Sequence, residues 1–143
     1  MPTHAEKRIL KFTPEQVFHL VADVERYPEF LPWVQEVAIR ERTPESFISE
    51  VTVGYKFIKE SYSCRVNLTP HSRIDIDYLS GPFRHLNNHW LFNSHPDGVE
   101  VDFFIDFEFQ SSLFQTMMSS VFSEAVKYMI TSFETRAQDI YPS

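Results

Sequence analysis

Apolar and polar residues alternate between Trp33 and Phe109, and this period of two is typical of β-strands with one buried face. The clearest alternation runs from Val101 to Phe109, where acidic residues separate the apolar ones. Turn-forming residues lie between such segments, at Gly81-Pro82 and at Pro96-Asp97-Gly98. The pattern predicts about six antiparallel strands in this part of the chain.

Two of these segments predict a hairpin, because their apolar positions can face each other. We predict a two-residue turn at Ile58-Lys59, because the register it sets puts the apolar partners on one face. Neither residue favours a tight turn. In that register the cross-strand pairs are Tyr55 with Tyr62, Val53 with Cys64 and Val51 with Val66.

The chain before these strands predicts one strand and two short helices. Residues 4–12 form the strand. Thr13 is then a helix N-cap, with a proline at the first helical position and Gln16 three residues after the cap. Pro28 interrupts this helix, because the residue before a proline is displaced from the α region. A second short helix is expected at residues 29–31.

After Ser111-Ser112 the apolar period changes to about 3.6, which predicts one helix over residues 112–139, about 40 Å long. One apolar stripe of this helix consists of Met118, Phe122, Val126, Met129, Phe133, Ala137 and Ile140. The order of elements predicts an α+β fold, in which a curved antiparallel sheet surrounds the long C-terminal helix. A strongly curved sheet leaves space beside a single helix, and a ligand can occupy that space.

The composition fits one globular domain over residues 1–143, with an unusual aromatic content. The chain has 14 Phe, 6 Tyr and 2 Trp against 3 Gly, and such rings suit either a thick core or the wall of an apolar cavity. The net charge of −7 argues against general binding to nucleic-acid phosphates, so we expect no DNA partner. The single cysteine, with no signal peptide or spanning segment, predicts a soluble protein of a reducing compartment.

The reactive side chains do not form a catalytic motif. His85 and His89 would have metal-ligand spacing on a helix, but their neighbours predict a strand, which separates the imidazoles by more than about 10 Å. Cys64 lies on the predicted apolar face, as buried thiols do. The acidic residues between Asp102 and Glu108 are expected to form a solvated strand face. We therefore predict no catalytic residue, no metal ion and no enzymatic activity.

The rings of the sheet and the methionines of the last helix form either a filled core or the wall of a pocket, and the sequence leaves both open. The Gly81-Pro82-Phe83 turn and residues 27–33 are candidates for the mouth of a pocket, or else ordinary turns. The candidate ligand-binding residues are Trp33, Tyr55, Tyr62, Phe83, Trp90, Phe103, Ile105, Phe107, Met118, Phe122 and Met129.

Residues 22–33, Ala-Asp-Val-Glu-Arg-Tyr-Pro-Glu-Phe-Leu-Pro-Trp, resemble the opening signature of the coenzyme-Q-binding START-type proteins. This family is also described as polyketide-cyclase-like, and its bacterial members include the ribosome-association toxin. The chain departs from many relatives at Val34, where they have a cysteine, but the family is not thought to use a catalytic thiol. Weaker matches follow in the same order, over nearly the whole chain, at Val53–Lys56, Glu60–Val66, Gly81–Phe83, Trp90 and Val101–Phe109.

The resemblance implies the helix-grip (START/Bet v 1-like) fold and ubiquinone binding, in which the isoprenoid tail is held in an apolar tunnel and delivered to the respiratory chain. It implies no cofactor besides ubiquinone as the bound ligand. The same resemblance permits an alternative, a protein that binds a ribosomal subunit and blocks subunit joining. We expect a cytoplasmic location with peripheral contact to the inner membrane, or the matrix side in a mitochondrion, because no mitochondrial presequence is visible.

Overall fold

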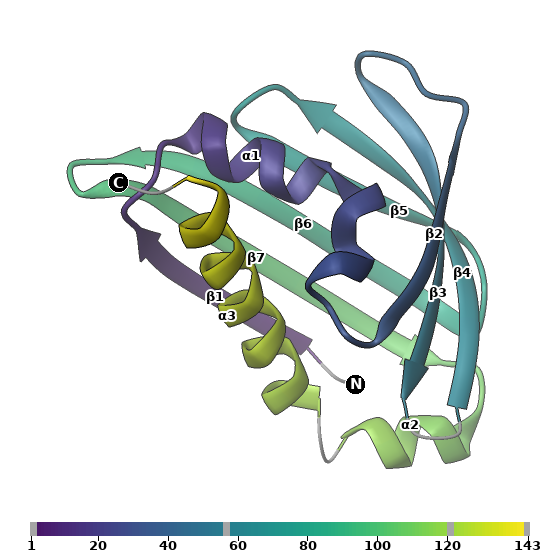
Figure 1. The fold of residues 1–143 in the computed structure, drawn as a ribbon. Coiled ribbons are helices and arrows are strands. Elements are labelled where there is room, and N and C mark those ends of the chain that lie inside the picture. The colour runs from purple at the N-terminus through teal and green to yellow at the C-terminus, as the bar shows by residue number, and fades with distance from the viewer. Residues whose placement is uncertain (1–2, 56–57, 120–121, 142–143) are drawn as a thin grey trace.

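A seven-stranded antiparallel sheet curves around the helices in the computed structural model (Figure 1), which describes residues 3–55, 58–119 and 122–141. The strand order is β1-β7-β6-β5-β4-β3-β2, so β1 and β2 are the edges. The six strands predicted after the short helices are confirmed. The strands are β1 (Thr3–Leu10), β2 (Val34–Arg40), β3 (Ser46–Tyr55), β4 (Ile58–Thr69), β5 (Arg73–Ser80), β6 (Phe83–His95) and β7 (Gly98–Phe109).

The helices lie on one side of the sheet, with α1 and α3 across its concave face (Figure 1). They are α1 (Pro14–Ala22), the 3-10 helix η1 (Val24–Glu29), α2 (Ser112–Ser119) and α3 (Phe122–Ile140). The helix start at Thr13 is confirmed as a capping box. Its hydroxyl accepts a hydrogen bond from the Gln16 amide at 3.1 Å, and the Gln16 side chain accepts one from the Thr13 amide at 3.0 Å.

Two boundaries near the N-terminus differ from the sequence prediction. Strand β1 ends at Leu10 rather than at residue 12. The helix predicted at residues 29–31 is wrong, because η1 comes earlier and contains Pro28. Pro28 lies inside this short 3-10 helix, and the amides of Arg26 and Phe30 on either side of it donate hydrogen bonds to the carbonyls of Asp23 and Tyr27.

The hairpin of β3 and β4 has a different register from the predicted one. Tyr55 pairs with Ile58, and residues 56–57 between them lie outside the described residues. Val53 pairs with Glu60 instead of Cys64, and Val51 pairs with Tyr62, which is a shift of four residues. An even shift keeps every side chain on its predicted face, so alternation alone cannot separate the two registers.

The single long helix predicted over residues 112–139 is also wrong, because α2 and α3 run in different directions (Figure 1). Helix α2 lies next to the end of β7, where the Phe109 amide donates a hydrogen bond to the Gln115 side chain at 2.9 Å. The sequence has Ser119-Ser120 at the junction, and serine hydroxyls compete with helical backbone hydrogen bonds. The α+β architecture is unchanged, because α3 alone, about 28 Å long, crosses the sheet.

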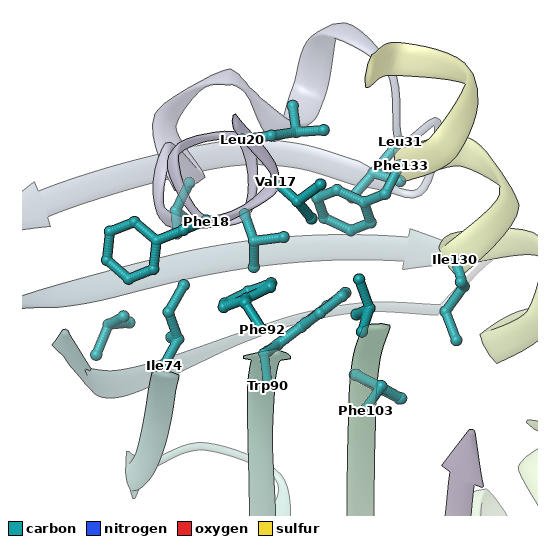
Figure 2. Close-up of a cluster of buried hydrophobic side chains, with 14 of the residues drawn as sticks. Val17, Phe18, Leu20, Leu31, Ile74, Trp90, Phe92, Phe103, Ile130 and Phe133 are labelled. Atoms are coloured by element: carbon teal, nitrogen blue, oxygen red, sulfur yellow. The ribbon is translucent and has the colours of Figure 1, made fainter. Parts of the chain in front are cut away.

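Helix α3 buries one stripe of its surface in the core. Among the described side chains the stripe differs from the predicted one at three positions: Ile130 is part of it, Met129 is only partly buried, and Ile140 is 42% exposed. Figure 2 shows Ile130 and Phe133 of α3 pointing toward Trp90 and Phe103 of the sheet, beneath α1. The buried residues of the stripe are Val126, Ile130, Phe133 and Ala137.

Candidate functional site

The concave face is filled where α1 and α3 meet above it. Trp90 and Phe103 are 4% and 1% exposed, and their ring centroids lie 4.7 Å apart. Phe133 of α3 closes this region from above, 5.3 Å from Trp90 (Figure 2). The cavity enclosed here, between β1, α1 and α3, measures about 10 Å³. That is the size of roughly one water molecule, so this end of the grip holds no lipid.

The next row of the concave face toward α2 is partly exposed. In the sheet register Ile105 lies beside Asn88, and Asn88 lies beside Ile76. All three are partly exposed, whereas the neighbouring row of Phe103, Trp90 and Ile74 is buried. The side chains above Ile105 and its neighbours therefore leave part of an apolar surface accessible on the inner side of the sheet. We call this partly exposed inner surface, between the filled core and the end of the sheet nearer α2, the chamber.

An aromatic group lies beyond the chamber, at the end of the sheet nearer α2. Five rings from four strands meet at Phe83, and we call them the Phe83 cluster. The centroid of the Phe83 ring lies 4.8 Å from Phe109, 5.5 Å from both Phe107 and Tyr78, and 5.7 Å from Tyr62. Three of these contacts are edge-on, an arrangement favourable for aromatic pairs.

The structure brings together some of the candidate ligand-binding residues named from the sequence. Tyr62, Phe83 and Phe107 belong to the Phe83 cluster. Trp90 and Phe103 are buried in the filled core. They pair across β6 and β7, one row away from Asn88 and Ile105.

Two further candidates lie on other elements and pack against the core, and Ile105 belongs to the partly exposed row. Met129 is partly buried on α3 and packs against the core. Trp33 precedes β2, and its ring lies 5.6 Å from Tyr128 of α3, which ties the η1–β2 connection to the helix. The side chains of the other three candidates lie outside the described residues: Tyr55, Met118 and Phe122.

Three residues of this region, Tyr78, Phe109 and Asn88, are not among the candidate ligand-binding residues named from the sequence. Tyr78 and Phe109 complete the Phe83 cluster, and both follow the period-two alternation that could have included them. Tyr27 lies outside this region, at the filled end, where its ring packs against Phe133 at 5.2 Å and its hydroxyl donates a hydrogen bond to the Val21 carbonyl. No sequence pattern singles out Asn88. Its side-chain amide donates a hydrogen bond to the Phe104 carbonyl on the neighbouring strand at 2.7 Å, and this contact depends on the strand register.

A chain of charged side chains links β1 to α3 at the edge of the grip. Glu6 binds His4 at 2.9 Å and the Arg8 guanidinium at 2.6 Å, and Arg8 reaches Glu134 of α3 at 3.3 Å. Burial acts to raise the pKa of Glu6, but the hydrogen bonds from His4 and Arg8 outweigh it and lower the pKa. The Glu6 carboxylate therefore stays ionised and keeps Arg8 in place against α3.

The two histidines of β6 lie next to different residues. His85 lies 3.4 Å from Asp106, whereas His89 stacks on Phe104, so the two imidazoles have separate partners. Within the described ranges no group of three or more His, Cys, Asp or Glu residues could hold a metal ion. None of the helices described is long and apolar enough to cross a membrane.

Cys64 is expected to react slowly with alkylating reagents. Burial raises the pKa of its thiol to about 12, and Asp77 adds to the shift, so very little thiolate exists at neutral pH. At pH 8, iodoacetamide should modify the folded chain at least ~100-fold more slowly than the urea-unfolded chain. The stability from the protonated thiol is present below pH 9.0 and is lost as the pH rises toward 12. Equal alkylation rates of the folded and unfolded chains would contradict the raised pKa and would make Cys64 a candidate nucleophile again.

Comparison with known proteins identifies the family. A family model described as polyketide cyclase / dehydrase and lipid transport matches residues 10–134, and the chain belongs to this family. The ribosome association toxin RatA of Rickettsia prowazekii is 36% identical over 137 residues, which cover 93% of this chain and 94% of the toxin. The mitochondrial coenzyme Q-binding protein COQ10 homolog B of Xenopus laevis is 32% identical over 143 residues, which cover 96% of this chain and 59% of the relative.

Solved structures confirm the predicted helix-grip fold. An 18 kDa protein from Caulobacter crescentus superposes with a TM-score of 0.82 at 34% identity, over 100% of both chains. A START superfamily protein from Mycobacterium smegmatis gives a TM-score of 0.80, over 96% of this chain and 98% of the other. Its identity of 16% shows the fold alone. The family description names enzymes as well as lipid transport, so membership does not separate a catalyst from a carrier.

Proposed function

We propose that this chain binds ubiquinone, or a similar prenylated lipid, in the chamber and supports its delivery in respiratory electron transport. The observation that carries the proposal is the row of Ile105, Asn88 and Ile76, which stays partly exposed beside a filled core. Each CH₂ group that leaves water gains about 0.8 kcal/mol, so a prenyl tail would favour such a surface. The coenzyme Q-binding name of the Xenopus relative supports this ligand class.

The proposed activity is binding without chemistry. Proton transfer would need a side chain that titrates near neutral pH inside the site. Burial instead raises the pKa of Cys64, Tyr27 and Tyr62, which holds all three in their protonated forms. This supports a carrier, and delivery to a membrane would then require peripheral contact of the chamber mouth with the inner membrane.

A second candidate function is binding to a ribosomal subunit with a block of subunit joining. The ribosome association toxin of Rickettsia supports it, because its sequence is 36% identical to this chain. The net charge of −7 favours contact with ribosomal proteins over contact with the RNA backbone. This function needs an outer surface and does not require an occupied chamber.

One pair of assays separates the two candidates. Purified protein is mixed with vesicles that contain a short-chain ubiquinone, and the quinone that stays with the protein after the vesicles are removed is measured. The same preparation is added to ribosomes, which are then analysed on a sucrose gradient. Quinone uptake without ribosome co-sedimentation would support the carrier. Co-sedimentation and loss of joined ribosomes without uptake would favour the second function.

A further inference from the structure

Three tyrosines lie around the concave face, and two of their hydroxyls have structural partners. The Tyr27 hydroxyl donates to the Val21 carbonyl, and the Tyr78 hydroxyl accepts from the Phe83 amide at 3.0 Å. The Tyr62 hydroxyl makes no hydrogen bond to any described residue. A tyrosine hydroxyl surrounded by protein normally has a partner, so its absence at Tyr62 calls for a physical reason.

The ring of Tyr62 is held firmly, so its hydroxyl has a defined position. Tyr62 lies opposite Val51 in the sheet, and the ring packs edge-on against Phe83. The Gly81 backbone closes the other side: a Cβ atom on Gly81, whose φ is +144°, would lie 2.6 Å from the Tyr62 Cβ. Tyr62 therefore lies directly against the Gly81-Pro82-Phe83 turn, one of the two mouths expected from the sequence.

The Tyr62 hydroxyl keeps some contact with solvent although the side chain lies deep in the protein. Among the described residues, His85 Nε2 is the polar side-chain atom that is sealed from solvent without a hydrogen bond. The Tyr62 oxygen is not sealed in this way, and the residue as a whole is partly buried. Burial raises the pKa of Tyr62 well above its usual value, so the hydroxyl is protonated at neutral pH and available as a donor.

Two guanidinium groups at the filled end of the grip are already paired with carboxylates, which favours an uncharged lipid head. The Arg8 guanidinium is paired with Glu6 and Glu134, so two carboxylates face one cation. Arg136 is paired with Glu29 at 2.6 Å. An anionic lipid head would compete with these carboxylates for each guanidinium, and it would lose its hydration on entering.

We propose that the Tyr62 hydroxyl donates a hydrogen bond to an uncharged acceptor oxygen on the head of the bound lipid, such as the carbonyl oxygen of a quinone ring. This assignment rests on the proposed lipid-binding function and adds the residue that selects the head group. Tyr62 acts in recognition, while the apolar tail is bound by the chamber.

The test compares two variants that each lose one hydroxyl, Tyr62→Phe and Tyr27→Phe. Fluorescence titrations measure the affinity of each folded variant for a short-chain ubiquinone, for squalene and for oleate. We expect Tyr62→Phe to bind ubiquinone about tenfold more weakly, the size of one neutral hydrogen bond, and squalene as well as the parent does. Tyr27→Phe should keep both affinities and lose stability, because the Val21 carbonyl loses its partner. Oleate should bind more weakly than ubiquinone.

The other outcomes overturn the assignment in distinguishable ways. Unchanged ubiquinone affinity in Tyr62→Phe would show that the hydroxyl does not contact the head, and would leave lipid binding itself intact. An equal loss for ubiquinone and squalene would show that the hydroxyl only shapes the chamber. Oleate binding as tight as ubiquinone binding would exclude an uncharged head as the preferred group. A parent chain that binds none of the three lipids would overturn the proposed function and this inference together.

Discussion

Replacing Phe133 with alanine is expected to lower the free energy of unfolding by about 3–5 kcal/mol. The Phe133 side chain is 4% exposed, and its ring contacts Trp90, Tyr27 and Phe30 at 5.2–5.3 Å. It also borders the cavity of about 10 Å³, so the vacated volume would add to a space that already exists. Urea unfolding followed by tryptophan fluorescence measures the change, since Trp90 lies directly beneath the ring.

The matched control is Tyr128→Ala, which removes a ring of similar size from the same helix. Tyr128 is 56% exposed and touches Trp33 from outside the core, so we expect a loss of about 1 kcal/mol or less. Similar losses for both variants would mean that α3 is not anchored through Phe133. The division into a filled end and an open chamber would then be wrong.

Replacing Met129 with tryptophan is expected to abolish lipid binding while the chain stays folded. Met129 lies one helical turn before Phe133 and is only partly buried, so the added ring would enter the chamber rather than the filled core. We expect a destabilisation below about 1.5 kcal/mol, compared with 1–3 kcal/mol for overpacking a filled core. Affinity for a short-chain ubiquinone should fall at least ~100-fold, or about 2.7 kcal/mol, in a fluorescence titration.

Tyr128→Trp is the control for this substitution, because it adds bulk at the neighbouring position on the exposed side of α3. It should leave both stability and ubiquinone affinity close to those of the parent. A Met129→Trp chain that fails to fold would show that Met129 belongs to an ordinary core. A folded variant that still binds ubiquinone as tightly as the parent would place the ligand elsewhere.

Features that depend on neighbouring residues were predictable from the sequence. The capping box joins Thr13 to Gln16, three residues away, and both hydrogen bonds are present. The alternation from Val101 to Phe109 likewise predicted β7, whose inward residues face the helices. In both cases the stabilising partner lies within the same short segment, so the local pattern is sufficient.

Features set by distant contacts were not predictable. The registers that pair Val53 with Cys64 or with Glu60 bury the same faces, so the hydrophobic pattern does not choose between them. The apolar period also continues from α2 into α3, although the two helices run in different directions. The position of α2 depends on a hydrogen bond between Gln115 and the backbone of Phe109 in the sheet.

Several aromatic residues of the candidate site were predictable from the sequence. Whether they leave an accessible surface beside them was not. Aromatic content pointed to Tyr62, Phe83 and Phe107, which do meet. Whether such rings fill a core or stay accessible depends on which side chains cover them, and Phe133 covers Trp90 whereas Ile105, in the next row, stays partly exposed. The missing partner of the Tyr62 hydroxyl has no signature in the sequence, because it depends on atoms from three other segments.

The central claim is that the chamber holds a prenylated, uncharged lipid, and analysis of the protein as it is purified tests this most directly. Native mass spectrometry gives the mass of any bound molecule, and organic extraction followed by chromatography identifies it. We predict a prenylquinone in stoichiometric amount on the parent chain and none on the Met129→Trp variant. A parent chain that carries no lipid, even after incubation with ubiquinone-containing vesicles, would contradict the account.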